Sequence, residues 1–146
     1  MTDFVLDNSV AMRWLLESEK VSDQKYAEKV LKSMTDSDAF VPNFWQLEAV
    51  SVLVGAEKCC NVSLGEIERF ISQLENLPIH TDPSTAHHAF SRTLILARAY
   101  DISSYDASYL ELAIREGLSL ATLDKKLIKA AKKADVDIYL KSPLSR

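Results

Sequence analysis

The stretch from residue 106 to residue 124, DASYLELAIREGLSLATLD, constrains the fold more than any other part of the chain. Its first half predicts a helix, because apolar residues recur there at helical spacing: Ala107, Leu110, Ala113 and Ile114. Gly117 is a typical residue to end a helix, and residues 118–123 are apolar enough for a strand buried on both faces. A helix followed by a strand carries the chain out and back. We therefore expect the carboxylates of Asp106 and Asp124 to lie at one edge of a sheet and to form part of a metal site.

Short apolar segments alternate with helical segments along the rest of the chain. Strands are expected at residues 4–6, 39–41, 78–81, 118–123 and 136–140. Helices are expected at residues 10–16, 23–33, 44–56, 64–74, 86–100 and 125–134, in addition to the helix that begins at Asp106. This alternation predicts an α/β fold with a mainly parallel sheet, and sites in such sheets form beyond the carboxyl ends of the strands.

The length of 146 residues fits one domain that spans residues 1–146. No apolar run approaches the ~18 residues that suggest a membrane span, and the N-terminus lacks the basic start of a signal peptide, so we expect a cytoplasmic protein. The net charge of -4 argues against a broad surface that coats nucleic acid, but it permits a local basic patch. Cys59 and Cys60 are adjacent, without metal-ligand spacing, and are expected to be reduced thiols.

Three aspartates lie at element boundaries, where a purely structural role is also open. Asp7 and Asp124 end predicted strands and precede predicted helices, and aspartate is a favoured N-cap residue. Asp106 follows Ser103 by three residues, which is the spacing of a capping box with aspartate in place of glutamate. A helix cap and a metal ligand are therefore both open interpretations for each aspartate.

Glu48 lies on a predicted helix that is apolar on nearly every side. Between residues 44 and 55 the only polar residues besides Glu48 are Gln46 and Ser51. A lone carboxylate on such a helix is rarely buried without a partner, and no lysine or arginine lies within one turn. A bound cation would explain this carboxylate, whereas the alternative is that Glu48 faces solvent at the edge of its helix.

The four acids are more informative together than apart. Four carboxylates in one cavity would repel one another, and each would raise the pKa values of the others unless cations held them. Ligation by oxygen alone, without histidine or cysteine, selects hard cations. The expected cofactor is therefore Mg²⁺ or Mn²⁺.

Four segments carry a resemblance to a known family: FVLDNSVAMRWLL, VPNFWQLEAVSVL, SSYDASYLELAIREG and LSLATLDKKLIKAA. Together they resemble the PIN-domain ribonucleases, in particular the VapC-type toxins of bacterial and archaeal toxin–antitoxin pairs, over nearly the whole chain. The resemblance implies a three-layer α/β/α fold whose central sheet has about five short, mainly parallel strands. It also implies an endoribonuclease that depends on Mg²⁺ or Mn²⁺ and hydrolyses RNA with a metal-activated water.

Carried over by position, the resemblance implies that metal ligation and catalysis belong to four acids: Asp7, Glu48, Asp106 and Asp124. Two hydroxyl residues stand near them, Ser9 after the first aspartate and Thr122 before the last, where a hydroxyl can orient a ligand or a water. Ser51 departs from the pattern, because many relatives have asparagine three residues after the glutamate. This departure concerns the surroundings of the ligands and not ligation itself.

RNA has to approach an acidic pocket from a basic rim. Arg13 and Lys125 lie nearest to the acids in sequence, and we expect them to contact phosphates. More lysines follow on the same helix, with Lys126 beside a stripe formed by Lys125, Lys129, Lys132 and Lys133. For the distal lysines, a solvated face with cations near the C-terminal end of the helix is an equally open interpretation.

The resemblance also implies protein partners. VapC-type proteins bind a cognate antitoxin and are generally homodimers, and no membrane partner is expected. Several aromatic residues lie near the acids in sequence: Trp14, Phe44, Trp45, Tyr105 and Tyr109. Core packing is the default role for them, and an antitoxin groove or stacking on RNA bases is the alternative.

Three other functions remain open from the sequence. A magnesium-dependent phosphatase with an aspartyl nucleophile would need a second acid two residues after Asp7, where Ser9 stands instead. A PIN-like module that only binds a partner would not need all four acids. A PIN nuclease in RNA processing, or one that acts on DNA, would share the acids but lack an antitoxin.

Overall fold

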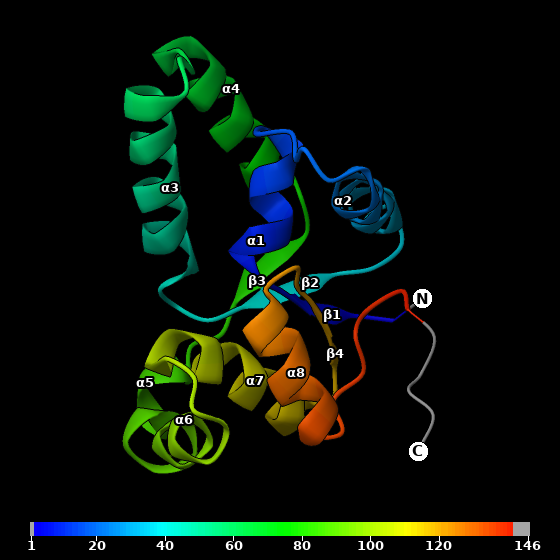
Figure 1. The fold of residues 1–146 in the computed structure, drawn as a ribbon, viewed down its shortest axis with the longest axis vertical. Coiled ribbons are helices and arrows are strands. Elements are labelled where there is room, and N and C mark those ends of the chain that lie inside the picture. The colour runs from blue at the N-terminus through cyan, green and yellow to red at the C-terminus, as the bar shows by residue number, and fades with distance from the viewer. Residues whose placement is uncertain (1, 142–146) are drawn as a thin grey trace.

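The computed structural model describes residues 2–141 and shows a parallel β-sheet between layers of helices (Figure 1). The sheet has the strand order β3-β2-β1-β4, with β1 at Phe4–Leu6, β2 at Ala39–Val41, β3 at Ile79–Thr81 and β4 at Ser119–Ala121. All neighbouring strands are parallel, and Val5 of β1 lies opposite both Phe40 and Leu120. The expected α/β fold with a parallel sheet is confirmed.

The fifth strand expected at residues 136–140 is reduced to a single parallel bridge between Ile138 and Leu120. The N–H of Leu120 donates to the carbonyl of Asp137, and the N–H of Tyr139 donates to the carbonyl of Leu120. Leu140 then adopts a positive φ of 61°, which turns the chain away from the edge of β4. The sheet of the described chain therefore has four strands, one fewer than expected.

Helices connect the strands and cover both faces of the sheet. Before β3 lie α1 (Asn8–Ala11), the 3₁₀ turn η1 (Met12–Trp14), α2 (Val21–Ser33), α3 (Trp45–Cys59) and α4 (Leu64–Glu75). After β3 lie α5 (Thr85–His88), the π-helical segment η2 (Ala89–Thr93), α6 (Leu94–Tyr100), α7 (Ser104–Glu116) and α8 (Lys125–Lys133). Figure 1 shows α1 to α4 on one side of the sheet and α5 to α8 on the other, which confirms the three-layer arrangement.

Two expected helices differ in detail from the structure. The helix expected at residues 10–16 begins earlier, at Asn8, and continues as the 3₁₀ turn η1. The helix expected at residues 86–100 contains the π-helical segment η2 in its middle. A π-helical turn holds more residues than an α-helical turn, so a pattern with helical periodicity does not reveal it. Gly117 ends α7 in the left-handed conformation, with φ 65°, as predicted.

Cys59 and Cys60 are joined by a disulfide at the end of α3, so the expectation of two reduced thiols is wrong. The helix ends between the two residues, because Cys60 has φ -129° and ψ 17°. This departure from helical backbone allows the neighbouring sulfur atoms to meet.

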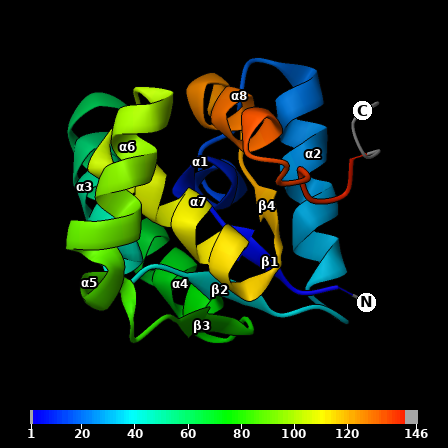
Figure 2. The same ribbon diagram turned by 90° about the horizontal axis from the view of Figure 1, so that it is seen from below.

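The core lies between the sheet and the helices on its two faces. Phe4, Val5 and Leu6 of β1 are completely buried, which is typical of a central strand covered on both sides. Phe4 also stacks on Tyr139, with the ring centroids 3.9 Å apart. On the face opposite α1, helix α7 lies against β1 between α6 and α8 (Figure 2). Among residues 2–141, no helix is long and apolar enough to span a membrane.

A buried ion-pair network anchors α7 to the end of β3. The Arg115 guanidinium donates from Nη2 to Asp82 Oδ2 at 2.6 Å and from Nε to Glu111 Oε2 at 2.8 Å. The Glu111 and Asp82 side chains are only 3% and 7% exposed. Burial alone would raise the pKa of Asp82, but the hydrogen bonds and charge of Arg115 hold this pKa below its usual value.

Replacing Arg115 with leucine should destabilise the fold by about 3 kcal/mol, because two buried carboxylates would lose their cation. Chemical denaturation at neutral pH measures this change. Glu116→Gln is the matched control, since Glu116 is half-exposed and lies 3.6 Å from the same guanidinium. Loss of the Glu116 charge should change the free energy of unfolding by less than about 0.5 kcal/mol. A similarly small effect of Arg115→Leu would contradict the anchoring role.

Candidate functional site

β1 and β4 are neighbours in the sheet, but the chain forms two other strands between them. It runs from β1 to β2 and β3 on one side, and only then crosses to β4 on the other side. Such a reversal of strand order opens a crevice beyond the carboxyl ends of the two strands, where ligands bind in open α/β sheets. Asp7 follows β1 directly, and Asp124 follows β4 by three residues. Both aspartates therefore lie at this edge.

Asp7 is buried, and two hydroxyl groups fix its carboxylate. Ser9 Oγ donates to Asp7 Oδ2 at 2.6 Å, and Thr122 Oγ1 donates to the same oxygen at 2.8 Å. Asp7 occupies the N-cap position of α1, but its side chain makes no capping hydrogen bond. The carboxylate is thus held by the neighbouring strand end and not by the helix that follows it.

The same two hydroxyl groups join the ends of β1 and β4. Ser9 Oγ accepts a hydrogen bond from the N–H of Leu123 at 2.9 Å, and Thr122 Oγ1 accepts one from the N–H of Asp124 at 3.1 Å. The N–H of Asp7 also donates to the carbonyl of Ala121 at 3.0 Å. The positions of Asp7 and Asp124 are therefore coupled through a short hydrogen-bonded path.

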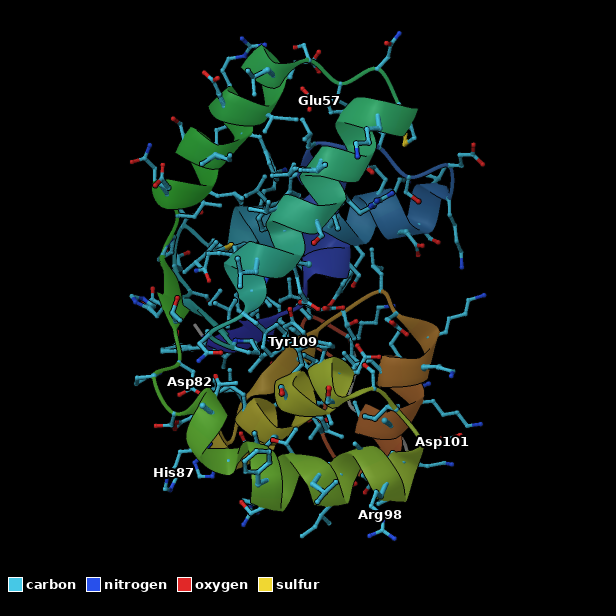
Figure 3. All side chains as sticks on the ribbon, turned by 90° about the vertical axis from the view of Figure 1, so that its left-hand side faces the viewer. Glu57, Asp82, His87, Arg98, Asp101 and Tyr109 are labelled. Atoms are coloured by element: carbon cyan, nitrogen blue, oxygen red, sulfur yellow. A yellow bond between two sulfur atoms is a disulfide. The ribbon has the colours of Figure 1, made fainter. Side chains whose placement is uncertain are left out.

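Glu48 reaches the same region from the first turn of α3, where it is half-buried. Its Oε1 accepts a 2.5 Å hydrogen bond from the hydroxyl of Tyr109 on α7 and a 3.4 Å bond from Asn8 Nδ2 on α1. Asn8 Nδ2 also donates to the carbonyl of Trp45 at 3.0 Å. Figure 3 labels Tyr109, which extends from α7 toward the helical layer that contains α3. Glu48 therefore faces the two strand ends and does not project freely into solvent.

Asp124 and Asp106 both begin helices. Asp124 is the N-cap of α8, and its Oδ1 accepts from the N–H groups of Lys126 at 2.9 Å and Leu127 at 3.3 Å. The predicted capping role of Asp124 is thus present, and it engages one carboxylate oxygen. At the start of α7, Ser103 Oγ accepts from the N–H of Asp106 at 3.1 Å, which is half of the expected capping box.

Electrostatic interactions connect all four acids. Burial raises the pKa of Asp7, the two hydroxyl hydrogen bonds lower it, and the charges on Glu48 and Asp124 raise it further. Burial also raises the pKa of Asp106 to about 6, with further increases from the charges on Asp124 and Asp7. The four carboxylates are therefore close enough to make the ionisation of their neighbours less favourable.

The chemistry of this cluster fits a hard divalent cation. The donors are carboxylate oxygens, which suit Mg²⁺ or Mn²⁺. A cation would relieve the mutual repulsion that, in addition to burial, raises the pKa values of Asp7 and Asp106. Among residues 2–141, no three Asp, Glu, His or Cys side chains already surround one point as a ready group of ligands. The acids are gathered at one edge of the sheet without forming a closed coordination shell.

Three further residues were expected near the site, and their surroundings differ. Ser51 is exposed on α3, and Lys125 is exposed at the start of α8. Arg13 is half-buried in η1, where its carbonyl accepts a 3.0 Å hydrogen bond from Gln24 Nε2. Within the described part of the chain, no hydrogen bond or ion pair joins any of the three side chains to the four acids.

Glu48 is held by Asn8 and Tyr109. Neither of these two residues was among the site residues expected from the sequence. Tyr109 follows Asp106 by three residues, which places both on the same face of a helix. That spacing is the feature from which a shared role was predictable. Asn8 follows Asp7 directly, but nothing in the sequence indicates its contact with α3.

Comparison with known proteins adds independent information. A family model described as PIN domain matches residues 4–133. The crystal structure of PAE2754 from Pyrobaculum aerophilum is similar, with a TM-score of 0.63 and 20% identity over 88% of this chain and 86% of that chain. The structure of FitAcB from Neisseria gonorrhoeae is similar too, with a TM-score of 0.58 and 17% identity over 93% of this chain and 96% of that chain. No curated protein matches the sequence. At these identities the structural likeness bears on the fold alone.

Substitution of Asp106 by asparagine should stabilise the metal-free protein, increasingly so as the pH rises from about 4 to 6. The pKa of Asp106 in the folded protein, about 6, lies above its ordinary value of 3.8. The folded state therefore retains a proton that the unfolded state has lost, and this stabilisation disappears as the pH rises through the folded pKa. At pH ~7 we expect Tm to rise by about 2–4 °C, which corresponds to about 1 kcal/mol.

Thermal unfolding in the presence of a chelator measures this difference between Asp106→Asn and the wild type. Taking the difference removes the opposite pH dependence of groups such as Asp82, whose pKa is lowered. Asp36→Asn, which changes an exposed aspartate in the turn after α2, is the control. A Tm difference that stays constant across the pH range would mean that folding does not raise the pKa of Asp106.

Proposed function

The chain belongs to the PIN domain family, and from this premise we propose that it is a divalent-metal-dependent endoribonuclease. The observation that supports this most strongly is the gathering of carboxylates from β1, α3, α7 and the β4–α8 connection at one sheet edge. The match to the family covers residues 4–133, which includes all four acids. PIN domains are generally nucleases, and we propose that the whole chain is a single such domain.

We assign the binding of Mg²⁺ or Mn²⁺ to four residues: Asp7, Glu48, Asp106 and Asp124. The bound cation would lower the pKa of a water molecule toward neutrality and offset negative charge on the phosphoryl oxygens. The hydroxyl groups of Ser9 and Thr122 engage Asp7 at Oδ2, so Oδ1 is left for the cation. Tyr109 and Asn8 engage Glu48 at Oε1, so Oε2 is left in the same way.

The proposed reaction is the hydrolysis of an RNA phosphodiester by water. The water oxygen bonds to phosphorus in line with the departing 3′ oxygen, the bond between phosphorus and that oxygen breaks, and a proton passes to the leaving oxygen. The products carry a 5′-phosphate and a 3′-hydroxyl group. No side chain has to form a covalent bond with the substrate, which agrees with Ser9 standing where an aspartyl-phosphate enzyme needs an acid.

We further propose that the protein is the toxin of a toxin–antitoxin pair and forms homodimers. The sequence resemblance to VapC-type toxins supports both an antitoxin partner and a second copy of the chain. Exposed apolar side chains on α3, η2 and α6 support protein contacts, because Leu47, Phe90 and Leu94 are 72%, 97% and 50% exposed. A PIN nuclease of RNA processing is the alternative, and the test is whether the product of the adjoining gene copurifies with the chain and blocks cleavage.

Glu48→Gln, Asp7→Asn, Asp106→Asn and Asp124→Asn should each lower Mn²⁺-dependent RNA cleavage at least about 100-fold, or ~2.7 kcal/mol in the barrier. Each change removes a charge that holds the cation but keeps the size of the side chain. Purified protein, cellular RNA and sequencing of the cleaved ends measure the activity and identify the substrate. Circular dichroism checks that each variant is folded.

Glu57→Gln is the matched control for Glu48→Gln, because Glu57 is exposed near the far end of the same helix, where Figure 3 labels it. It should keep full activity. Undiminished metal-dependent cleavage by Asp106→Asn would show that the site is assigned wrongly. Wild-type protein that binds Mn²⁺ but cleaves no RNA would favour a binding module instead.

A further inference from the structure

A basic hollow lies between α8 and the end of α6, next to the acidic cluster. It has a volume of about 230 Å³, and its lining includes Lys126, Lys129 and Lys133 from α8 together with Tyr100 and Asp101 from the end of α6. Figure 3 labels Asp101, where the end of α6 lies beside α8. We call this hollow the lysine groove.

The three lysines line the groove together because of their spacing on α8. Residues at positions i, i+3 and i+7 of a helix share one face. Leu127 and Ala131 lie on another face of α8 and are fully buried in the core, which fixes the orientation of the helix. Lys125 and Lys132, which were expected to belong to the same basic stripe, do not line the groove.

The ammonium groups of the lysine groove form no ion pairs with the described residues. Among residues 2–141, none of the three lysines forms a salt bridge with an acid, and the nearby Asp101 forms none either. Three cations face one carboxylate along this lining, so the groove carries an excess of positive charge. This local excess contrasts with the net charge of -4 of the whole chain, and it favours an anionic ligand.

The groove adjoins the acidic cluster at Lys126. The N–H of Lys126 donates to Asp124 Oδ1 at 2.9 Å, so the first lysine of the groove directly adjoins one of the four acids. A polymer that occupies the acidic site can therefore continue into the groove without leaving the surface of α8.

Stabilisation of α8 does not explain this arrangement. Cations near the C-terminal end of a helix interact favourably with its dipole, which accounts for Lys132 and Lys133 in the last turn. Lys126 lies in the first turn, where the dipole disfavours a cation. The helix dipole therefore does not account for Lys126, which lines the groove together with Tyr100 and two further lysines.

We propose that the lysine groove binds single-stranded RNA beside the cleaved bond, with Lys126, Lys129 and Lys133 on successive phosphates and a base against Tyr100. Single strands are bound by this combination, in which cations follow the backbone and an aromatic ring stacks on a base. The inference rests on the proposed nuclease function and adds where the substrate strand lies. An acidic peptide would use the lysines but not the ring of Tyr100.

The first test measures binding of a fluorescent single-stranded RNA of about 12 nucleotides by the full chain in chelator at several salt concentrations. The triple variant K126A/K129A/K133A should bind at least about tenfold more weakly, and its slope of log affinity against log salt should fall by about 2. The control K25A/K29A/K32A removes three exposed lysines with similar spacing from α2 and should stay within about twofold of the wild type.

Substitution of Tyr100 provides a second test, in which the charge of the groove does not change. Tyr100→Leu should weaken RNA binding about tenfold without changing the salt slope, because it removes the aromatic ring but no charge. Circular dichroism checks that the variant is folded, since Tyr100 also packs against the core. Tyr100→Phe keeps the ring and should bind like the wild type. Weakening of equal size in the α2 control, or unchanged binding by K126A/K129A/K133A, would overturn the inference. Equal competition by polyglutamate, with no effect of Tyr100→Leu, would overturn it in favour of an acidic peptide.

Cleavage assays separate failure of the groove from failure of the nuclease. With Mn²⁺, K126A/K129A/K133A should lower kcat/KM on long RNA at least about tenfold, chiefly through a higher KM. Normal kcat/KM in this variant would refute the groove and leave the nuclease standing. A different result is that the wild type cleaves no RNA but binds it more tightly than the triple variant does. This result would support RNA binding by the groove and refute the proposed nuclease activity.

Discussion

The burial of several carboxylates side by side is the constraint on which the site depends. Burial raises the pKa values of Asp7 and Asp106, and the charges of the neighbouring acids raise both further. Crowding of this kind costs stability in the metal-free protein, and the cation that we propose to bind here would offset this cost. The hydroxyl groups of Ser9 and Thr122 and the phenol of Tyr109 hold these acids in place despite the repulsion.

Helix α7 connects this site to the rest of the fold. Its first half carries Asp106 and Tyr109, which face the acids, and its second half carries Glu111 and Arg115, which bind to Asp82 at the end of β3. The buried ion pair therefore fixes the helix that positions part of the site. On the other side of the acids, α8 begins with the cap formed by Asp124 and continues as the lining of the lysine groove.

The layered fold was predictable from the sequence because short apolar segments alternate with helical ones, and the strands at residues 4–6 and 39–41 have the expected bounds. The convergence of Asp7 and Asp124 followed from strand ends that share one edge. Details that depend on tertiary contacts were not predictable. The left-handed turn at Leu140 shortens the last strand to one bridge, and the contact of Asn8 with Glu48 joins helices far apart in the chain. The rotation of α8, set by Leu127 in the core, decides which lysines face the groove.

Calorimetric titration of the protein with Mn²⁺ at pH ~6 tests the central claim most directly, because the cation must displace protons from acids with raised pKa values. We expect saturable binding to the wild type, with proton release seen as a dependence of the heat on the buffer. Asp106→Asn should bind Mn²⁺ more weakly and release fewer protons. Absence of binding to the wild type, or identical titrations of the two proteins, would contradict a divalent-cation site at this edge of the sheet.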